Sequence, residues 1–559
     1  MGTVIEMIGC NCVKIGKSEE NSSKYLCKIE NTAGTPPEKK VNLKIETRDF
    51  IRQLNEDVFK VYEKIKKLGE GAYGSVYSVR RKDTDIIRAL KIIDKSKLYD
   101  GGDDDENNIK NEINILKQID HPNIMKIFEF FEDNNSFYVI AEYCDSGDLH
   151  KIYENFGVFP EFLLKYVMYQ VFLGISFLHN NHVVHSDVKE ENIAFQNISN
   201  EKSDSDLNIF SKIMKNDKFL KEVENNISPE KLSPETNRIL SKLCNLEVKI
   251  IDFGAAKFNK KNKKLTGIAG TDYYCSPEII HEKYSFMCDE WACGVMMYIL
   301  LSGNPPFPGD TEEEIFDNVL NTELNFDNLK NISPQCKDLI SKLLIKDGEK
   351  RLKATEALKH EFFKTGVNIG NLLKGKQNEN AELLETYIND KLKSNKKGNN
   401  LKFKDAVIAY IVFKFLDKNE ENKIKKVFRQ LSGEDKNYLI TKDTFVNYMK
   451  STSRELGETD INQIYSELDQ NQSGTIEYEE LMRGLCDKKK ILSDKNLKDA
   501  FAFFDRDKNG KISLDEVTEI IFEGEAMPPN IKKDFIDEFG KDMSDTDIDY
   551  DDFLKIIKG

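Results

Sequence analysis

Two twelve-residue segments near the end of the chain, beginning at Asp469 and Asp505, carry the same pattern of oxygen-bearing residues 36 positions apart. Carboxylate, amide or hydroxyl side chains occupy the first, third and fifth positions, a glycine the sixth and a glutamate the twelfth. Calcium prefers oxygen ligands, and the glycine permits the sharp turn of a loop that joins two helices around the ion. The pattern therefore predicts helix–loop–helix units that bind calcium. The predicted ligands are Asp469, Asn471, Ser473, Thr475 (through its carbonyl), Glu477 and Glu480, then Asp505, Asp507, Asn509, Lys511 (through its carbonyl), Ser513 and Glu516.

Two further segments follow this pattern incompletely. In residues 432–444, Asn437 replaces the glycine and Thr444 ends the loop without a bidentate acid. In residues 541–552, Lys541 takes the first ligand position. We expect no tight calcium binding in the earlier loop and weak or no binding in the later one. Their expected role is to pair with the intact loops, which gives four helix–loop–helix segments.

Composition disfavours several other classes of protein. Asp plus Glu total 97 against 82 Lys plus Arg, and this net charge of −15 disfavours binding to nucleic-acid phosphates. None of the ten cysteines belongs to a CxxC pair, which fits a reducing compartment. The longest apolar runs, such as Gly294–Leu301, are far shorter than the roughly 18 residues that span a bilayer. We expect a monomeric, cytoplasmic protein.

The start of the chain carries candidate lipidation sites. Residues 1–55 are polar and are interrupted by a glycine and two prolines, which predicts a flexible leader. Myristoylation of Gly2 together with palmitoylation of Cys10 and Cys12 would supply the two anchors that stable membrane attachment requires. Glu6 stands where the myristoylation motif has Ser or Thr. Membrane association and an unmodified tail both stay open.

The middle of the chain changes from strand-like to helix-like patterns. Short β-branched runs at Val76–Val79, Ile86–Ile93 and Phe137–Glu142 are separated by turns, as in an antiparallel sheet. After Pro160 longer helical periods dominate, and Asp289–Leu301 is apolar enough to be a buried helix. The pattern predicts an α+β fold with a β-rich small lobe followed by an α-rich large lobe.

Three glycines, Gly69, Gly71 and Gly74, lie between strand-like runs. Because they lack a Cβ atom, they let backbone amides approach an anionic phosphate. A dinucleotide-binding turn would need a helix to open directly after them, whereas Val76 begins a strand-like run. The pattern therefore favours a hairpin that covers a phosphate.

Lys91 stands on an otherwise apolar strand, where a buried ammonium group is costly unless it meets a phosphate or a carboxylate. The best candidate partner is Glu112, on a helix predicted over Asn107–Gln118. The alternative is that Glu112 faces solvent.

A further group of polar residues suits phosphoryl transfer from ATP. Asp187, Lys189 and Asn192 place a carboxylate, an ammonium group and an amide within six positions, and Asp252 follows a mostly apolar run. Asp252 and Asn192 are predicted to hold Mg²⁺ against ATP oxygens, since magnesium binds oxygen ligands. Asp187 is predicted to accept the proton of the attacking hydroxyl group.

Taken in order, these motifs resemble the signature set of protein kinases. The resemblance covers about residues 62–363 and implies a bilobal protein-kinase fold that binds ATP and Mg²⁺. Lys189, two positions after Asp187, resembles the serine/threonine kinases, in which it neutralises developing charge. The resemblance also implies a structural ion pair between Glu278 and Arg351. The matching motifs are Gly69–Val76, Lys91, Glu112, Asp187–Asn192, Asp252–Gly254, Ser276–Glu278, Asp289 and Arg351.

The same resemblance implies an adenine site. The backbone of the hinge, from Glu142 to Cys144, would bind the base, and Val76 and Ala89 would lie on its two faces. Ala141 then occupies the position behind the adenine that limits the pocket. Its small side chain implies an apolar space there.

Three departures from the family pattern are present. Ser186 replaces the usual Arg, and Glu190 replaces the usual Pro. The usual Arg binds a phosphorylated activation loop, so we do not expect activity to depend on phosphorylation of Thr266. The third departure is an insertion at 199–247, rich in Asn, Lys, Glu and Ser. This composition predicts a mobile segment that lacks a packed core and loops outwards from the metal site.

Two acidic positions, Glu191 and Asp148, lie near the expected peptide groove. They imply protein substrates with a basic residue before the target Ser or Thr. The alternative is that both are ordinary surface acids.

Kinase motifs followed by four calcium-loop segments resemble the calcium-dependent protein kinases of plants and apicomplexan-type protists, over about residues 62–559. In that family a junction inhibits the kinase when calcium is absent, and the calcium module releases it. Here the junction is predicted at 364–426 and an all-α EF-hand module at 427–559. Leu401–Leu416 is apolar around most of its circumference, which suits a ligand for a groove opened by calcium and equally a core helix of the module.

The predicted function is calcium-activated transfer of the γ-phosphoryl group of ATP to protein Ser and Thr hydroxyls. Two alternatives stay open. One is a calcium-responsive pseudokinase scaffold, which only Ser186 favours. The other is a kinase whose EF-hands merely buffer calcium.

Overall fold

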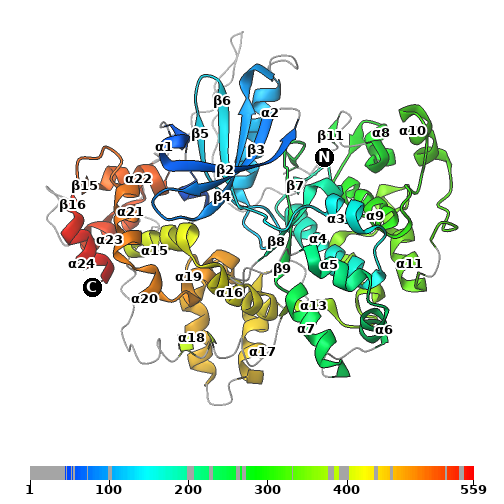
Figure 1. Cartoon of the computed structure of the whole chain (residues 1–559). Helices are drawn as coiled ribbons and strands as arrows, with labels where there is room; N and C mark the ends of the chain where they lie inside the picture. Colours follow the sequence, from blue (N-terminus) through cyan, green and yellow to red (C-terminus); the bar gives the residue numbers. More distant parts are fainter. Residues whose placement is uncertain are drawn as a thin grey trace, which may run out of the picture. The chain divides into compact units, whose positions relative to one another are not determined.

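The computed structural model describes the chain from Ile45 to Lys558 (Figure 1). Gly2, Cys10 and Cys12 of the predicted leader therefore lie outside the described residues. Residues 42–559 form one compact unit, in which the two lobes and the C-terminal part contact each other. Between Ile45 and Lys558 the description leaves out residues 46, 52, 55–56, 72–73, 98–103, 198–206, 226–230, 260–264, 267–271, 330–331, 375–382, 385, 389–401, 433–438, 453–456, 523–525 and 540–546.

The small lobe is built on a six-stranded sheet of order β1-β5-β6-β4-β3-β2. Neighbouring strands run antiparallel, except that β1 and β5 are parallel. The antiparallel sheet predicted from the sequence is confirmed, and the three predicted strands match β3, β4 and β6 to within two residues at each end. The strands are β1 (Gln53–Leu54), β2 (Tyr62–Gly71), β3 (Gly74–Arg81), β4 (Ile87–Asp94), β5 (Ile127–Glu132) and β6 (Ser136–Ala141).

Helix α2 (Asp104–Gln118) is the main helix of the small lobe and ends at the predicted residue. Ile109, Ile113 and Leu116 are buried and recur at helical spacing, so one face of the helix is apolar. Glu112 lies on this buried side. The lobe also contains η1 (Thr47–Phe50), α1 (Val58–Val61) and η2 (Lys95–Lys97).

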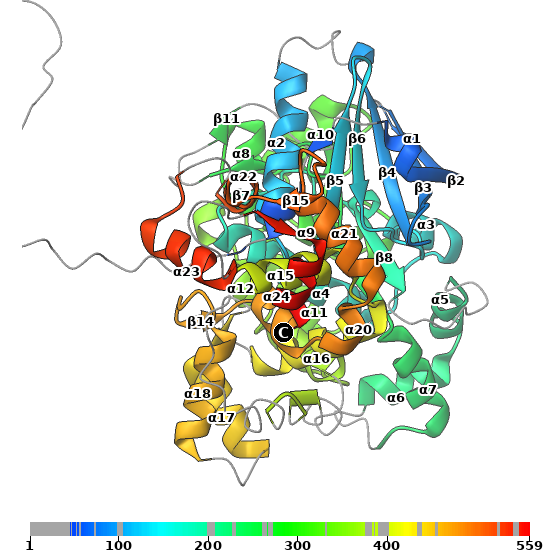
Figure 2. The ribbon, with the colours of Figure 1, turned by 90° about the vertical axis from the view of Figure 1, so that its left-hand side faces the viewer.

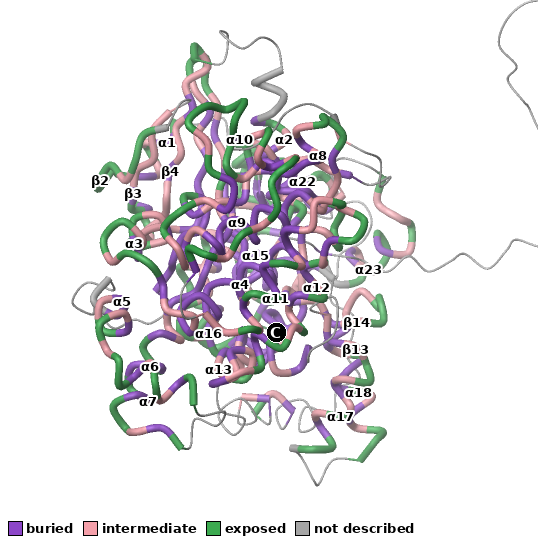
Figure 3. The backbone as a smooth tube through the Cα atoms, turned by 90° about the vertical axis from the view of Figure 1, so that its right-hand side faces the viewer, coloured by how far each residue is buried: buried purple, intermediate pink, exposed green. Residues whose placement is uncertain are grey.

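The large lobe is mainly helical, and its core contains α4 (Glu161–Asn180) and α9 (Met287–Ser302). Both helices are apolar on nearly every side and almost wholly buried (Figure 3). By length and composition α4 could cross a membrane, but 83% of its apolar window is buried inside the protein. It is therefore explained as a core helix. The other elements are α3 (Leu149–Phe156), β7 (Val183–Val184), η3 (Glu190–Asn192), β8 (Ile193–Asn197), β9 (Leu246–Ile250), β10 (Lys257–Phe258), β11 (Leu265–Thr266), η5 (Asp272–Tyr274), α8 (Pro277–Ile280), β12 (Lys283–Tyr284), α10 (Glu312–Asn321), α11 (Pro334–Leu343), η6 (Gly348–Lys350), α12 (Ala354–Ala357) and η7 (Glu361–Phe363).

The prediction that 199–247 lacks packed structure is wrong for its described residues. They form three helices, α5 (Leu207–Met214), α6 (Asp217–Asn225) and α7 (Pro234–Leu243). On either side of them β8 and β9 pair in register as a hairpin, and β9 already begins at Leu246. The insertion therefore leaves the hairpin at its far end, away from Asn192 and Asp252, as expected.

The helices of the insertion are amphipathic, and their apolar faces pack on the large lobe. The ring of Phe210 lies 5.1 Å from that of Phe195 on β8, and the ring of Phe219 lies 5.5 Å from that of Phe162 on α4. Ser233 caps the first turn of α7 through its side chain. The polar residues that suggested a mobile segment supply the exposed faces of these helices.

The C-terminal part is helical apart from two short two-stranded sheets, β13 with β14 and β15 with β16. The boundary predicted between residues 426 and 427 falls inside α16, so the module begins with this helix. Its elements are α16 (Lys418–Leu431), β13 (Ile440–Thr441), α17 (Lys442–Thr452), α18 (Glu458–Leu468), β14 (Thr475–Ile476), α19 (Tyr478–Leu485), α20 (Lys488–Ile491), α21 (Asp494–Phe504), β15 (Lys511–Ile512), α22 (Leu514–Ile521), α23 (Pro529–Phe539), β16 (Ile548–Asp549) and α24 (Tyr550–Lys558).

The predicted junction at 364–426 contains helices held by different parts of the protein. Helix α13 (Ile369–Lys374) contacts both α4 of the large lobe and α16, and it buries Ile369 and Leu373. Helix α15 (Lys402–Phe415) contacts α21 and α24 of the C-terminal module (Figure 2), and it also contacts α19 and α23. The apolar segment predicted at Leu401–Leu416 is thus a helix that packs against the module.

Removal of one buried ring tests the packing of the insertion. Phe219→Ala is expected to lower the free energy of unfolding by roughly 3–5 kcal/mol, because it leaves a cavity between α6 and α4. Urea unfolding measures the loss. Lys218→Ala, on the exposed side of the same helix, should stay within about 0.5 kcal/mol of the wild type. Equal stability of the two variants would show that the insertion does not pack on the lobe.

Candidate active site and calcium loops

Strand register brings the predicted nucleotide-binding residues onto one face of the small-lobe sheet. Val76 of β3 lies opposite Lys91 of β4, and Ala89 of β4 lies opposite Ala141 of β6. Directly opposed residues point to the same face, and so do residues two apart on one strand. All four side chains therefore share the face from which Lys91 reaches Asp252 of the large lobe.

The three predicted glycines lie in the hairpin of β2 and β3, where Gly71 pairs with Gly74. A Cβ atom at Gly74 would overlap the carbonyl oxygen of Ile92, so only glycine fits there. Gly69 has open space around it. A strand follows the glycines, which excludes the dinucleotide-binding turn and agrees with a hairpin that covers a phosphate.

Lys91 lies between two carboxylates. Its Nζ is 2.8 Å from Oε1 of Glu112 and 3.4 Å from Oδ1 of Asp252. Burial alone would lower the pKa of Lys91, but the two carboxylates raise it above its ordinary value, so the group is charged. Lys91 in turn lowers the pKa of Asp252. Glu112 is buried, so the alternative of a solvent-facing Glu112 is wrong.

Asp187, Lys189 and Asn192 form a second cluster on the loop from His185 to Asn192, which we call the catalytic loop. Nδ2 of Asn192 donates to the Asp187 carboxylate over 2.9 Å and to the Asp187 carbonyl over 2.8 Å. Nζ of Lys189 lies 2.9 Å from the same carboxylate. These contacts fix the direction of the Asp187 side chain, which suits a group that must orient an attacking hydroxyl.

Asp289, in the first turn of α9, holds the catalytic loop from the core. Its carboxylate accepts hydrogen bonds from the amides of His185 over 2.9 Å and Ser186 over 2.8 Å. Nε2 of His179 lies 2.8 Å from it. Burial alone would lower the pKa of His179, but Glu290 and Asp289 raise it to about 10, so the imidazole is charged. The Asp289 carboxylate therefore faces a cation and two amides.

The residues present fit ATP and Mg²⁺. Asp252 offers carboxylate oxygens, and Asn192 keeps its amide oxygen because its amide nitrogen makes the bonds to Asp187. An all-oxygen donor set is the one that Mg²⁺ prefers. When bound, Mg²⁺ neutralises charge on the phosphoryl group that is transferred. Lys91 places an ammonium group beside this donor set, where it can pair with phosphate oxygens.

The side chain of the first hinge residue is engaged in an ion pair that the sequence did not indicate. The carboxylate of Glu142 lies 2.9 Å from Nζ of Lys249, and the backbone amide of Glu142 donates to the carbonyl of Lys126. Burial alone would raise the pKa of Glu142, but Lys249 lowers it to about 2. Burial raises the pKa of the Cys144 thiol to about 12, so it stays neutral. The Glu142 side chain is thus engaged within the protein, which leaves the hinge backbone as the group that the resemblance implies for adenine.

A buried charge network, also missed from the sequence, joins this hinge to the C-terminal module. Oε2 of Glu247 lies 2.7 Å from Nζ of Lys425, and Oε1 lies 2.7 Å from Nη2 of Arg429. Lys249 lies 3.4 Å from Glu247 and so connects it to Glu142. The sequence signal that could have indicated this network is a pair of charged residues on the apolar strand β9. Two cations four residues apart on α16 could have been recognised as their partners.

The two acids predicted near the peptide groove have different surroundings. Asp148 caps α3 by accepting from the amide of Lys151, and it also pairs with Nζ of Lys151 at 2.7 Å. Its role is therefore structural. Glu191 is exposed and lies directly before Asn192. The side chain of Thr266 lies outside the described residues, although its backbone forms part of β11.

Both intact calcium loops have the turn that the ligand order requires. Gly474 and Gly510, at the sixth positions, have φ of 85°, which favours glycine. Asp469 and Asp505, at the first positions, each accept hydrogen bonds from the amides four and five residues later. Each loop is therefore closed around its first ligand.

The ligand atoms of these loops fit calcium. In the second loop, carboxylate oxygens of Asp505, Asp507 and Glu516 all lie within 4.8 Å of one another. In the first loop, Glu480 reaches back to accept a hydrogen bond from the amide of Asn471 over 3.1 Å. Clustered oxygens of this kind are the donor set that calcium takes. When bound, calcium supplies the positive charge that such clusters lack.

The expected pairing of damaged loops with intact loops is confirmed. Strand β13, from the segment 432–444, pairs with β14 of the first intact loop. Strand β16, from the segment 541–552, pairs with β15 of the second. Whether the damaged loops bind calcium depends on residues 433–438 and 541–546, which lie outside the described part of the chain.

The two lobes, with Lys91, Asp187 and Asp252 where they meet, define a protein kinase, and the paired helix–loop–helix units define an EF-hand module. Comparison with known proteins gives the same classes. A model of the protein kinase domain matches residues 62–363, a model of the EF hand matches 466–485, and a model of the EF-hand domain matches 496–524.

Curated relatives span nearly the whole chain. Calcium-dependent protein kinase 4 of Plasmodium berghei is 30% identical over 92% of this chain and 90% of its own length. Calcium-dependent protein kinase 5 of Plasmodium falciparum is 30% identical over 97% of this chain and 86% of its own length. Calcium-dependent protein kinase 3 of Plasmodium berghei is 31% identical, with 92% and 84% covered.

The chain belongs to the calcium-dependent protein kinases. It is a calcium-activated serine/threonine protein kinase that uses ATP and Mg²⁺ and binds Ca²⁺ through its EF-hands. The assignments of individual site residues rest on the motifs and geometry described above.

Proposed function

We propose that calcium controls this kinase by deciding where helix α15 is held. Without calcium the junction, residues 364–426, inhibits the kinase. The calcium-loaded EF-hands bind α15 and so release the kinase from this inhibition. The burial of α15 between the EF-hand module and the small lobe carries the proposal.

The EF-hand module encloses the apolar side chains of α15. Phe403 is fully buried, and its ring lies 5.5 Å from that of Phe504 and 6.1 Å from that of Phe553. Seven residues later, the ring of Tyr410 stacks on Phe503 at 4.1 Å. Apolar anchors at this spacing are typical of a helix laid in a groove. The groove ligand and the core helix expected from the sequence are thus compatible descriptions of α15.

The end of α15 rests on the small lobe. The ring of Phe413 lies 5.4 Å from that of Phe128 on β5 and 6.1 Å from that of Phe50 on η1. Nζ of Lys414 lies 2.6 Å from Glu129 on β5. Because β5 pairs with β6, which ends at the hinge, these contacts connect α15 to the nucleotide site.

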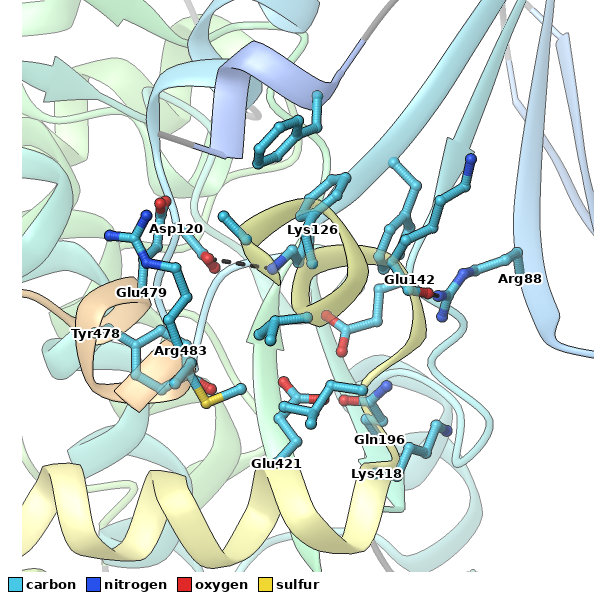
Figure 4. Close-up of a pocket in the computed structure, with 18 residues that line it drawn as sticks. Arg88, Asp120, Lys126, Glu142, Gln196, Lys418, Glu421, Tyr478, Glu479 and Arg483 are labelled. Atoms are coloured by element: carbon cyan, nitrogen blue, oxygen red, sulfur yellow. Dashed lines mark hydrogen bonds and ion pairs between the residues drawn. The ribbon is translucent and has the colours of Figure 1, made fainter. Parts of the chain in front are cut away.

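A cavity of about 70 Å³ lies where α15, the hinge and the first intact EF-hand meet (Figure 4). Glu142 of the hinge and Arg88 of β4 line it from the kinase, and Tyr478 and Arg483 of α19 line it from the module. Helix α19 also carries the calcium ligand Glu480. Ligation in this loop therefore acts on a helix that forms part of the wall around the hinge.

In this arrangement the catalytic groups are in place. Lys91 is paired with Glu112, and the Asp187 carboxylate is held by Lys189 and Asn192. This supports the interpretation of the docked arrangement as the released form of the kinase. Loss of calcium would then free α15 to act as the inhibitor.

The twelfth-position glutamates test the switch. The double variant Glu480→Gln, Glu516→Gln is expected to lose at least roughly tenfold of calcium-stimulated activity, because each loop loses its bidentate ligand. The measurement is transfer from ATP to a basic Ser/Thr peptide, in calcium and in chelator. Asp187→Asn supplies the inactive baseline.

Asp515→Asn is the matched control, because Asp515 directly precedes Glu516 on the same helix but is exposed and does not occupy a ligand position. It should keep the wild-type calcium response. Equal wild-type activity in calcium and chelator would contradict the switch. No activity in either condition, with folding intact, would favour a scaffold.

We further propose that the kinase prefers substrates with a basic residue before the target Ser or Thr. The exposed carboxylate of Glu191, close to Asp187, supports this preference, whereas Asp148 is engaged by Lys151. Glu191→Gln is expected to raise KM roughly fivefold for a peptide with Arg before the target, but not for its Ala counterpart. An equal change for both peptides would contradict the preference.

We also propose a cytoplasmic monomer that associates with membranes through acylated Gly2, Cys10 and Cys12. The sequence of the leader supports this proposal, since two acyl chains are needed for a stable anchor. Mass spectrometry of the N-terminal peptide from cells should show both kinds of chain, and Gly2→Ala should move the protein to the soluble fraction. An unmodified peptide would contradict it.

A further inference from the structure

Two departures from the kinase pattern lie close together in the catalytic loop, and the structure gives them different environments. Ser186 is buried with φ of 65°, and its hydroxyl has no hydrogen-bond partner among the described residues. A serine at this position offers no positive charge to the activation segment, by which we mean the chain from Asp252 to Glu278 that contains Thr266. Glu190, by contrast, is 3% exposed and accepts a hydrogen bond from the hydroxyl of Tyr274. Glu190 therefore contacts the activation segment, whereas Ser186 offers that segment no charged contact.

Tyr274 stands at the end of η5, just before α8 closes the activation segment. Further along, Cys275 is buried in a small apolar cluster with Val184. Glu278 makes a two-point ion pair with Arg351, at 2.5 and 2.9 Å. These contacts fasten the segment to the body of the large lobe. The Tyr274 bond fastens it to the catalytic loop itself.

We infer that Glu190 is a positioning residue for the protein substrate. Its hydrogen bond to Tyr274 holds the end of the activation segment against the catalytic loop and so sets where the substrate hydroxyl lies relative to Asp187. No phosphate on the segment is needed for this bond. Glu190 directly follows Lys189 and stands two residues before Asn192, so its bond to Tyr274 lies between the two residues that contact the Asp187 carboxylate.

Chemistry favours this assignment. A carboxylate inside a protein is costly unless its oxygens receive hydrogen bonds. A hydrogen bond to a charged acceptor is stronger than one between neutral groups, and burial strengthens it further. A phosphate-dependent fastening would require a cation on the catalytic loop at Ser186, where the chain has none. The inference concerns the active kinase and does not depend on how calcium releases it.

Steady-state kinetics of the full chain at saturating calcium, after phosphatase treatment, test the inference. Tyr274→Phe removes only the hydroxyl and is expected to raise KM for the peptide roughly tenfold, with KM for ATP unchanged. Glu190→Ala should have the same effect, and the double variant should be no worse than either single variant. Glu190→Gln keeps an oxygen that can accept the bond and should recover most of the loss.

Tyr273→Phe is the matched control. Tyr273 is the neighbouring residue, but it is 37% exposed and donates to the carbonyl of Gly309, so its loss should leave peptide kinetics unchanged. Wild-type peptide KM in both Tyr274→Phe and Glu190→Ala would overturn the inference, and so would additive losses in the double variant. Loss of wild-type activity on phosphatase treatment would also overturn it. An equal rise in KM for ATP would point to general damage instead and would count against it.

Discussion

The rest of the active site depends on the contacts that the carboxylate of Asp289 makes. This carboxylate is buried on a helix that is apolar apart from Asp289, Glu290 and Ser302, and a carboxylate without partners would be strongly destabilising there. Two backbone amides and the charged ring of His179 supply its partners. The same bonds hold Ser186 at a positive φ that a serine rarely adopts, which turns the loop so that Asp187 follows in place.

A second buried carboxylate, that of Glu247, holds the EF-hand module against the kinase, just as Asp289 holds the catalytic loop against the core of the large lobe. It receives Lys425 and Arg429 from α16 and Lys249 from its own strand. Removing one partner of such a network leaves an uncompensated charge, so the docked arrangement is favoured only when all partners are present. Since Lys249 also holds Glu142, docking of the module and the position of the hinge are parts of one network.

Sequence reasoning worked best where chemistry restricts both residue type and spacing. The calcium loops, Lys91 and Asp187 were identified because an ion or a phosphate allows few alternatives at each position. Prediction from the sequence failed for the insertion at 199–247, because its polar composition was given more weight than its apolar residues at helical spacing. Within it, Ser233 caps α7 and Pro234 follows at the first helical position, and a capping serine followed by proline is a recognisable helix start.

Pairings between distant segments could be predicted only where a family motif implied them, as for Glu278 and Arg351. Glu247 and Lys425 are 178 positions apart, and no local pattern indicates that β9 and α16 will meet. The bond from Tyr274 to Glu190 was equally hidden, although the unusual Glu190 was visible in the sequence. In both cases a buried charge was recognisable only after the fold supplied its burial. A charged residue at a family position that normally carries none is the signal that could have directed attention there.

The two intact calcium loops adjoin the contacts that hold α15 and the hinge. Phe503 and Phe504, which pack on Tyr410 and Phe403, directly precede the loop that begins at Asp505. The loop that ends at Glu480 continues into α19, which lines the cavity beside the hinge. The damaged loops contribute paired strands that keep these two loops in shape. Calcium binding at these two loops would therefore act directly beside residues that touch α15 or the hinge, which is what the proposed switch requires.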